Sequence, residues 1–262
     1  MLFGGVVRHI NDIERLRNEG FDFGEIALLG PRARRYWSGS GVTNDGGMDG
    51  FFLIAHGPHE AVTNDMDYTR NRYVEDMKST IDFMDDMGIR SLNIHLAVDA
   101  SIACDVIGEK LLALRRLVDY AGRRGILLNL ENISETADDF RDIINAVPGI
   151  GLTIDTGHAN LDTEVNRSVS IISEWGGFIR HAHFHDNLGG CMRGEGVSHG
   201  DLHLQLGCGN IDFVPIVGEL MKVGFEGTIT FETTPRTQLA SRERLETIIR
   251  QIREGKPCGG GM

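Results

Sequence analysis

The stretch GLTIDTGH at residues 151–158 sets the pattern from which we predict the fold. Its first five residues form a short, largely apolar run that follows a Gly-containing turn, which is typical of a buried β-strand. Asp155 ends the run, and His158 follows on the turn. A strand that ends in side chains able to bind metal is the unit that recurs along the chain.

Seven further runs have the same strand length and the same apolar or alternating character. Helical patterns separate most of them, although the helix after the second run is poorly defined. The eight candidate strands are residues 2–7, 22–29, 51–55, 90–96, 126–131, 151–155, 178–184 and 227–232. The clearest helical patterns are residues 68–87, 103–124, 136–146, 213–223 and 239–253.

Eight strand-helix units in about 250 residues predict the α/β class and a single (β/α)8 TIM barrel, with its chemistry at the carboxyl mouth of the strands. No internal linker indicates a second domain. We expect the barrel to cover residues 1–254 and residues 255–262 to be a flexible tail. The Gly-rich stretch at residues 38–50 is expected to be a loop.

The composition excludes some classes of protein. The 262 residues are 41% hydrophobic and carry a net charge of −12, which argues against a broad electrostatic grip on nucleic acid. A local cluster of cations, or bound divalent ions, could still hold phosphate. No apolar run approaches the roughly 20 residues that span a bilayer, and the N-terminus lacks a signal-peptide pattern. We expect a cytoplasmic protein with no membrane partner and with four reduced cysteines.

Nine side chains of metal-binding types lie at or just after the strand-like runs. The carboxyl ends of barrel strands meet at one mouth, so ligands scattered along the sequence would share one pocket. Mixed imidazole and carboxylate ligands favour zinc, manganese or iron over magnesium or calcium. We predict a polynuclear metal site and no organic cofactor. The predicted ligands are His56, His95, Glu131, Asp155, His158, His183, Asp201, His203 and Glu232.

Simpler interpretations exist for each residue alone. A single His at a strand end is more often a hydrogen-bonded structural residue, and a single Asp or Glu is often the cap of the next helix. Neither interpretation explains why six consecutive candidate strands each end in a residue of a ligand type. The joint pattern therefore favours a metal site.

Five motifs carry a resemblance to a known family. They are LEN at 130–132, IDTGHANL at 154–161, HFHDN at 183–187, DLHLQLGCGNIDF at 201–213 and GTITFETTP at 227–235. At these residues the chain resembles the xylose-isomerase-like TIM barrels, the superfamily that includes AP endonuclease family 2, sugar isomerases and sugar epimerases. The resemblance covers nearly the whole chain, from the first strand to Glu232. The motifs are specific for the superfamily and less specific for a reaction.

The resemblance implies two alternative ligand sets. Epimerases and isomerases of the superfamily hold one metal, which here would bind Glu131, Asp155, His183 and Glu232. Endonuclease IV enzymes hold three zinc ions, and each of their ligand positions has a match in this chain. In that set, the first ion would bind His56, His95 and the bridging Glu131, the second Asp155, His183 and Glu232, and the third His158, Asp201 and His203. The matches favour the three-metal type, with zinc or manganese.

The three-metal set predicts a metal-dependent hydrolase that cleaves a phosphoester. Two metals about 3.5 to 4 Å apart can share a hydroxide, while a third stabilises the leaving oxygen. The alternative is a sugar or sugar-phosphate isomerase or epimerase, in which Glu131 and Glu232 around one metal remove and return a proton next to a carbonyl. Both functions make these two glutamates catalytic. Metal storage is disfavoured, because storage does not need ligands around a substrate-sized mouth.

The basic segment GPRARRYW at residues 30–37 follows the second candidate strand. By the resemblance, Arg34 matches an arginine that enters the abasic gap in DNA. The simpler interpretation is a solvated basic loop. If the segment is functional, it could equally hold the phosphate of a small sugar phosphate. We predict Arg34, Arg35, His185 and Asp186 as substrate-binding residues.

The match to endonuclease IV is weaker for DNA recognition. That family wedges an aromatic and an aliphatic residue into DNA, and the matching positions here are His59 and Glu60. A carboxylate is a poor wedge next to phosphates, so we expect weak binding to duplex DNA. The expected partner is a small phosphorylated or sugar substrate, with damaged DNA as a further candidate. The oligomeric state is left open.

Overall fold

The computed structural model describes residues 1–44, 50–58, 68–98, 102–191 and 200–255. Eight parallel strands form a closed barrel, in which each strand pairs with the next and β1 pairs with β8. The predicted (β/α)8 barrel is therefore confirmed. The strands are β1 (Leu2–Val7), β2 (Phe23–Ala27), β3 (Phe52–His56), β4 (Ser91–His95), β5 (Leu127–Glu131), β6 (Gly151–Asp155), β7 (Ile179–Phe184) and β8 (Thr228–Phe231).

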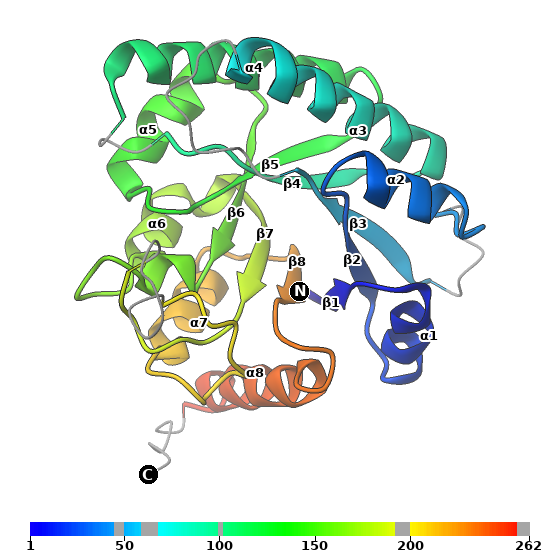
Figure 1. Ribbon diagram of the computed structural model, residues 1–262. Helices are drawn as coiled ribbons and strands as arrows, with labels where there is room; N and C mark the ends of the chain where they lie inside the picture. Colours follow the sequence, from blue (N-terminus) through cyan, green and yellow to red (C-terminus); the bar gives the residue numbers. More distant parts are fainter. Residues whose placement is uncertain (45–49, 59–67, 99–101, 192–199, 256–262) are drawn as a thin grey trace.

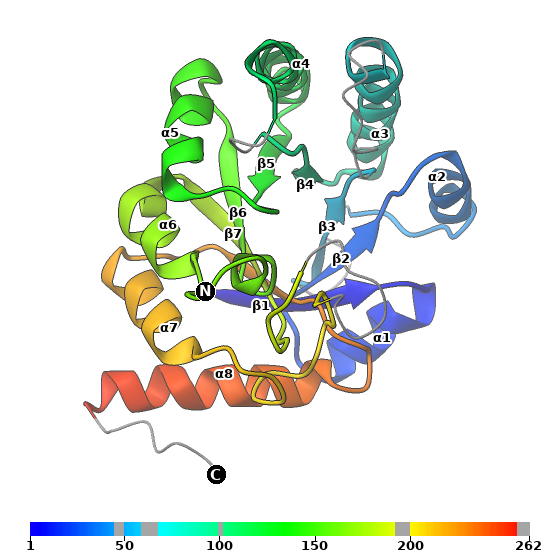
Figure 2. The same cartoon turned by 60° about the vertical axis from the view of Figure 1, so that its left-hand side comes forward.

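The helices lie around the outside of the barrel in both views (Figure 1, Figure 2). The α-helices are α1 (Ile10–Asn18), α2 (Pro31–Ser38), α3 (Val74–Met87), α4 (Cys104–Gly122), α5 (Ala137–Ala146), α6 (Ser168–Trp175), α7 (Phe213–Lys222) and α8 (Gln238–Arg253). Shorter helical turns are η1 (Tyr68–Tyr73), η2 (His158–Asn160) and η3 (Gly176–Phe178).

Successive side chains of a strand point alternately into the hydrophobic core and into the barrel interior. In β5, Leu128 and Leu130 are buried within the hydrophobic core. Asn129 and Glu131, which point to the opposite face, make polar contacts inside the barrel. Both faces of a parallel barrel strand are covered, which explains why these strands read as nearly continuous apolar runs.

A buried polar layer fills part of the barrel interior, where branched apolar side chains are usual. The amide nitrogen of Asn93 donates a hydrogen bond of 2.7 Å to Glu25. The amide oxygen of Asn93 accepts hydrogen bonds from Asn129 and from Thr153. The layer consists of Glu25, Asn93, Asn129, Thr153 and His181, which come from β2, β4, β5, β6 and β7 and are all buried.

The strand register brings the predicted ligands to one level of the barrel. His95 lies opposite Glu131 in the β4–β5 pairing, and Asp155 lies opposite His183 in the β6–β7 pairing. Neighbouring strands of a sheet lie about 4.8 Å apart, so side chains at paired positions on the same face are close neighbours. Residues far apart in sequence therefore meet at the carboxyl mouth.

The observed elements differ from the expected ones at residues 68–87 and in the segment after β2. The pattern at 68–87 divides into the π-helical turn η1 and the helix α3, and the segment after β2 forms a regular helix, α2, with Pro31 at its first turn. Apart from Gly255, the expected tail lies outside the described residues. Among the described helices, none has the length and apolar character needed to cross a membrane.

Candidate metal centre

The centre of the site is the Nδ1 atom of His183. It lies 3.1 Å from Oε1 of Glu131, 3.7 Å from Oδ2 of Asp155 and 3.9 Å from Oε2 of Glu232. These carboxylates come from the ends of β5 and β6 and from the residue that follows β8. We call Glu131, Asp155, His183 and Glu232 the central set. Its first three members are buried, and about a fifth of the Glu232 side chain is exposed.

Three atoms of the central set are buried without a hydrogen-bond partner. They are Oε1 of Glu131, Oδ2 of Asp155 and Nδ1 of His183. The other oxygen of Asp155 accepts a hydrogen bond of 2.6 Å from the backbone N–H of His158. Buried polar atoms are nearly always satisfied, so a cluster of unsatisfied oxygens around one nitrogen fits a bound cation.

A second group shares the carboxylate of Glu131. Its Oε2 atom lies 3.3 Å from Nε2 of His56 and 3.1 Å from Nε2 of His95, while its Oε1 atom faces His183. The rings of His56 and His95 are nearly perpendicular, with centroids 4.8 Å apart. Glu131 therefore has one oxygen directed at each group.

A third group lies next to Asp155. Nε2 of His203 is 3.2 Å from Asp201, and Nε2 of His158 is 3.9 Å from the same carboxylate. His185 approaches Asp155 at 3.2 Å, and its ring stacks on that of His203 at a centroid distance of 4.1 Å. The structure thus brings all nine predicted ligands into one cluster, together with His185.

Backbone carbonyls orient three of the imidazoles. Nδ1 of His56, His158 and His203 donates to the carbonyls of Gly57, Asn132 and Glu232 at 3.0, 3.0 and 2.8 Å. A carbonyl can only accept, so Nδ1 carries the proton, and in the neutral ring Nε2, which faces the carboxylates, acts as an acceptor or a ligand. This is the usual arrangement around metal-binding histidines.

The charges of the cluster shift the pKa of several groups. Burial acts to raise the pKa of Glu131, but the positive charges of His183 and His95 outweigh it and hold that pKa well below its usual value. Burial acts to lower the pKa of His183, but Glu131 and Glu25 raise it well above the usual value. Against burial, Asp201 and Glu232 raise the pKa of His203 to about 9. Imidazolium charges thus balance the carboxylates, and a metal cation could replace those protons.

Asp186 positions the segment that carries Asp201 and His203. Its carboxylate accepts backbone N–H hydrogen bonds from Asn187 and, across the loop, from residues of the GCGNI stretch. A pair of backbone hydrogen bonds also joins Asp186 to Leu204. Its carboxylate therefore accepts from backbone donors and holds this loop in place, and the predicted contact of Asp186 with substrate stays a prediction. The loop donors to the Asp186 carboxylate are Gly207, Gly209 and Ile211.

His185 was also predicted to bind substrate. The structure places its ring against that of His203 and beside Asp155, among the metal-type side chains, where it is fully buried. Gly157 is required next to it, because a Cβ atom at that position would overlap the imidazole ring. His185 is therefore better described as a member of the third group than as a substrate contact.

The basic segment does not join the cluster. Arg34 lies on α2, and its guanidinium donates hydrogen bonds of 2.8 Å to Thr80 and Asp76 of α3. Arg35 lines a cavity of about 630 Å³ between the same two helices. Both side chains therefore lie between α2 and α3, apart from the cluster, and their binding of substrate stays a prediction. His59 and Glu60 lie outside the described residues.

The sequence prediction missed two buried residues. Glu25 contacts both His183 and His181, at 3.1 and 3.3 Å. Glu25 lies in the middle of β2 and His181 in the middle of β7, whereas the prediction considered strand ends. A charged residue inside an apolar run was the available signal, because a buried carboxylate needs a partner.

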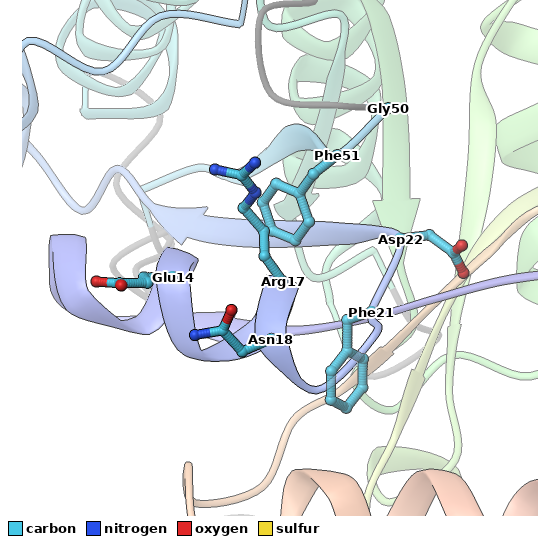
Figure 3. Close-up of a pocket in the computed structure, with 7 residues that line it drawn as sticks. All are labelled: Glu14, Arg17, Asn18, Phe21, Asp22, Gly50 and Phe51. Carbon is cyan, nitrogen blue, oxygen red and sulfur yellow. The ribbon is translucent and has the colours of Figure 1, made fainter.

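Two cavities differ in their relation to the cluster. A cavity of about 110 Å³ adjoins it, and its lining includes Glu25, His56 and Glu232. A larger cavity, of about 610 Å³, lies at the amino ends of β2 and β3 and is lined from α1 and from the segments that lead into these strands (Figure 3). Of these two cavities, the smaller is the one lined by side chains of the cluster among the described residues.

A closed (β/α)8 barrel with imidazoles and carboxylates at its carboxyl mouth defines a class of TIM-barrel proteins with a candidate metal centre. Within this class, the chain belongs to the xylose isomerase-like TIM barrel family, whose model matches residues 13–254. The predicted superfamily is thus confirmed. The match includes every residue of the cluster.

Individual relatives carry more specific names. The L-ribulose 3-epimerase of Methylomonas sp. (strain DH-1) is 33% identical over 131 residues, which are 46% of this chain and 40% of that protein. This chain covers 52% of an uncharacterized protein of Methanocaldococcus jannaschii, so it spans about half or less of the curated relatives it matches. A D-tagatose 3-epimerase-like protein superposes with a TM-score of 0.75 at 23% identity, covering 97% of this chain and 99% of that one. The IOLI protein, solved with a zinc atom, gives a TM-score of 0.72 at 15% identity, covering 96% and 99%.

These relatives overturn the prediction of a phosphoester hydrolase. The named sequence relative is a sugar epimerase, and the superposed structure is named after another. The predicted alternative, an isomerase or epimerase, agrees better with both. The physical reason for the error is that a set of metal-type side chains predicts where ions can bind, and the same ions can serve either proton transfer or hydrolysis.

Proposed function

We propose that this protein is a metal-dependent isomerase or epimerase that acts on a keto-sugar. The observation that carries the proposal is the central set, in which two glutamates and an aspartate converge on one buried imidazole nitrogen. The unsatisfied atoms of the central set fit a divalent cation. The name of the Methylomonas relative supports a ketose as the substrate class.

The two glutamates have different surroundings, which suits a pair of proton-transfer groups. A bound divalent cation would polarise the substrate carbonyl and acidify the adjacent C–H. Glu131 is buried among imidazoles, whereas Glu232 lines the 110 Å³ cavity. One carboxylate removes the proton from the carbon next to the carbonyl, and the other carboxylic acid donates a proton to the opposite face of the same carbon. The configuration of that carbon is thereby inverted.

Further ions can be accommodated in the same cluster. His56, His95 and Oε2 of Glu131 form a group of three possible ligands, and their atoms lie within 4.8 Å of one another. We propose this group as a second cation site, with zinc or manganese as the ion because the ligands are mixed nitrogen and oxygen. Elemental analysis of protein purified without chelator tests this: one ion per chain in the wild type, unchanged in His56→Ala, would count against the second site.

Proton exchange with solvent tests the reaction directly. The wild-type protein, loaded with zinc or manganese, is incubated in D₂O with a panel of ketoses, aldoses and their phosphates. We expect deuterium to enter at the carbon next to the carbonyl of at least one ketose, detected by NMR and mass spectrometry. Glu131→Gln and Glu232→Gln should each reduce the rate at least 100-fold, because loss of a general acid or base typically costs about 10² to 10⁴ in rate.

A matched control separates chemistry from general effects of substitution. Glu174 is on the surface, where it pairs with Arg141. Glu174→Gln should therefore exchange deuterium at the wild-type rate. The proposal fails if the metal-loaded protein binds its ions yet exchanges no deuterium with any sugar of the panel.

A further inference from the structure

The buried carboxylate of Glu25 has no part in the proposed proton transfer. It is only 2% exposed and lies in the polar layer of the barrel interior. Its oxygens lie 3.1 and 3.2 Å from Nε2 of His183, and Oε2 lies 3.3 Å from Nε2 of His181. Asn93 donates to the same carboxylate at 2.7 Å. Three side chains from two strands, β4 and β7, therefore converge on Glu25.

The contact with Glu25 decides which nitrogen of His183 carries a proton. An ionised carboxylate only accepts hydrogen bonds, so Nε2 of His183 must donate. In the neutral ring, Nδ1 then carries the lone pair, and Nδ1 is the atom that faces the three carboxylates of the central set. In His56, His158 and His203, a hydrogen bond to a backbone carbonyl orients the ring. His183 instead directs Nε2 at the charged side chain of Glu25.

We propose that Glu25 is a positioning residue, which fixes the tautomer and the ring orientation of His183 and thereby increases the affinity of the central set for its cation. The proposal rests on the cation site of the proposed function, and it is independent of which sugar is the substrate. Carboxylates that accept from a metal-binding imidazole also raise its basicity.

Glu25→Gln is the informative substitution. The amide keeps the size of the side chain but replaces one acceptor oxygen with an NH₂ donor, so its two ends can no longer both accept from Asn93 and His183 as the carboxylate does. We expect the affinity for Zn²⁺ or Co²⁺, measured by competition with a chromophoric chelator, to fall by about 10- to 100-fold, which is typical when the outer partner of a metal-binding histidine is lost. The number of ions bound at saturation should be unchanged.

Thr153→Val is the matched control. Thr153 belongs to the same polar layer and donates to Asn93, but no hydrogen bond or ion pair links it to Glu25 or His183 among the described contacts. Valine keeps its shape, so this variant should bind the metal with wild-type affinity. A similar loss in both variants would overturn the proposal, because it would show that any disturbance of the layer weakens the site.

NMR of the wild-type protein gives a test that needs no variant. In zinc-loaded protein with ¹⁵N-labelled histidine, the His183 ring should show a proton on Nε2 and none on Nδ1. A proton on Nδ1 would overturn the proposal. So would loss of one whole equivalent of metal in Glu25→Gln with the remaining sites unaffected, because Glu25 would then be a direct ligand.

The outcomes separate this inference from the proposed function. If the wild type and Glu25→Gln bind zinc equally well, only the role of Glu25 is wrong. If the wild type binds neither Zn²⁺ nor Co²⁺, the proposed metal-dependent function fails together with the role of Glu25. Absence of sugar exchange with normal metal binding would leave the Glu25 measurements valid.

Discussion

At the scale of single residues, Asp186 shows how a buried carboxylate can serve structure next to a site rich in functional carboxylates. Its oxygens accept four backbone hydrogen bonds, three of them from the loop that holds Asp201 and His203 near the central set. Removal of this acceptor would leave four backbone N–H groups without this partner, two of them buried, those of Asn187 and Ile211. The position of Asp201 and His203 therefore depends on a residue that does not face the cluster.

Asp186→Ala should be severely destabilising. We expect the free energy of unfolding of the metal-free protein, measured with urea, to fall by about 3 kcal/mol or more, because each buried unsatisfied donor costs about 1–3 kcal/mol. The control is Asp138→Ala, which removes an exposed ion pair with Arg141 and should cost less than about 1 kcal/mol. Equal, small losses in the two variants would contradict the structural role of Asp186.

His203 gives the metal-free protein a dependence on pH. Its pKa in the folded protein is about 9, above the value near 6.5 expected for the unfolded chain. A group whose pKa is raised by folding contributes stability that is complete below the unfolded pKa and is lost as the pH rises through the folded pKa. The melting temperature of the metal-free protein should therefore decline between pH 6.5 and 9.

His203→Asn tests the origin of that decline. The variant removes the titrating ring but keeps a residue type that tolerates the positive backbone φ of 47° at this position. Its melting temperature should fall less steeply than that of the wild type over the same range. Identical slopes would assign the pH dependence to other groups.

The sequence indicated which metal-type side chains would lie close together, and their role as ligands stays a prediction. All nine predicted ligands lie in one cluster, because strand ends in a barrel must converge. Glu25 was missed since it lies inside a strand, and the backbone hydrogen bonds of Asp186 were not foreseen since a sequence does not reveal which backbone groups a carboxylate will accept from. Arg34 pairs with Asp76, a contact set by helix packing and therefore invisible in the local pattern.

At the scale of elements, the turn from β6 into η2 is constrained by close packing. Gly157 sits where a Cβ atom would overlap the ring of His185, which itself contacts Asp155. Asn132 fixes the same strand end, since its side chain accepts from the N–H of Asp155 and donates to its carbonyl. The turn thus holds the backbone of one member of the central set in place.

Gly157→Ala should disturb both stability and metal binding. Overpacking of a tight site typically costs about 1–3 kcal/mol, so we expect a loss of this size in urea unfolding together with weaker binding of zinc. Gly108→Ala is the control, because Gly108 lies within α4 and no atom lies within 4 Å of a Cβ built there. That variant should gain about 0.5–1 kcal/mol from helix propensity. Unchanged zinc affinity in Gly157→Ala would show that the turn adapts.

The strands were predicted more accurately than the helices. Each predicted strand agrees with an observed one to within a few residues, because short apolar or alternating runs near Gly-containing turns are a local signal. The helix α2 was poorly defined in the sequence because its eight residues include three arginines, and its burial relies on Trp37 alone. Hydrogen bonds from Arg34 to Thr80 and Asp76 link that helix to α3, and a local apolar pattern does not reveal them.

At the scale of the whole molecule, cation binding should couple to the stability of the barrel. The central set draws on β5, β6, β7 and the end of β8, so unfolding would destroy the site, and an ion that binds only the folded state stabilises it by mass action. The reaction could not be predicted at this scale from the ligand set, because that set determines where cations can bind and leaves the substrate open.

Addition of metal should therefore raise the melting temperature. Zn²⁺ or Mn²⁺ at 100 times its dissociation constant should add about 2.7 kcal/mol, which for a domain of this size is a rise of roughly 5 to 10 °C. Mg²⁺ at the same concentration should have a smaller effect, because the ligands include imidazoles. His183→Ala should abolish most of the shift. A wild-type melting temperature that no transition metal changes would argue against a cation in the central set.

The pairing of β1 with β8 has a consequence for the order of events during synthesis. A ribosome makes the chain from its first residue, so His56, His95 and Glu131 emerge long before Glu232. The barrel cannot close until β8 has left the exit tunnel and joined β1. Incomplete nascent chains therefore offer the cell's free metal only a partial, open set of donors. A chain that holds its ion at the full central set has already joined its first strand to its last.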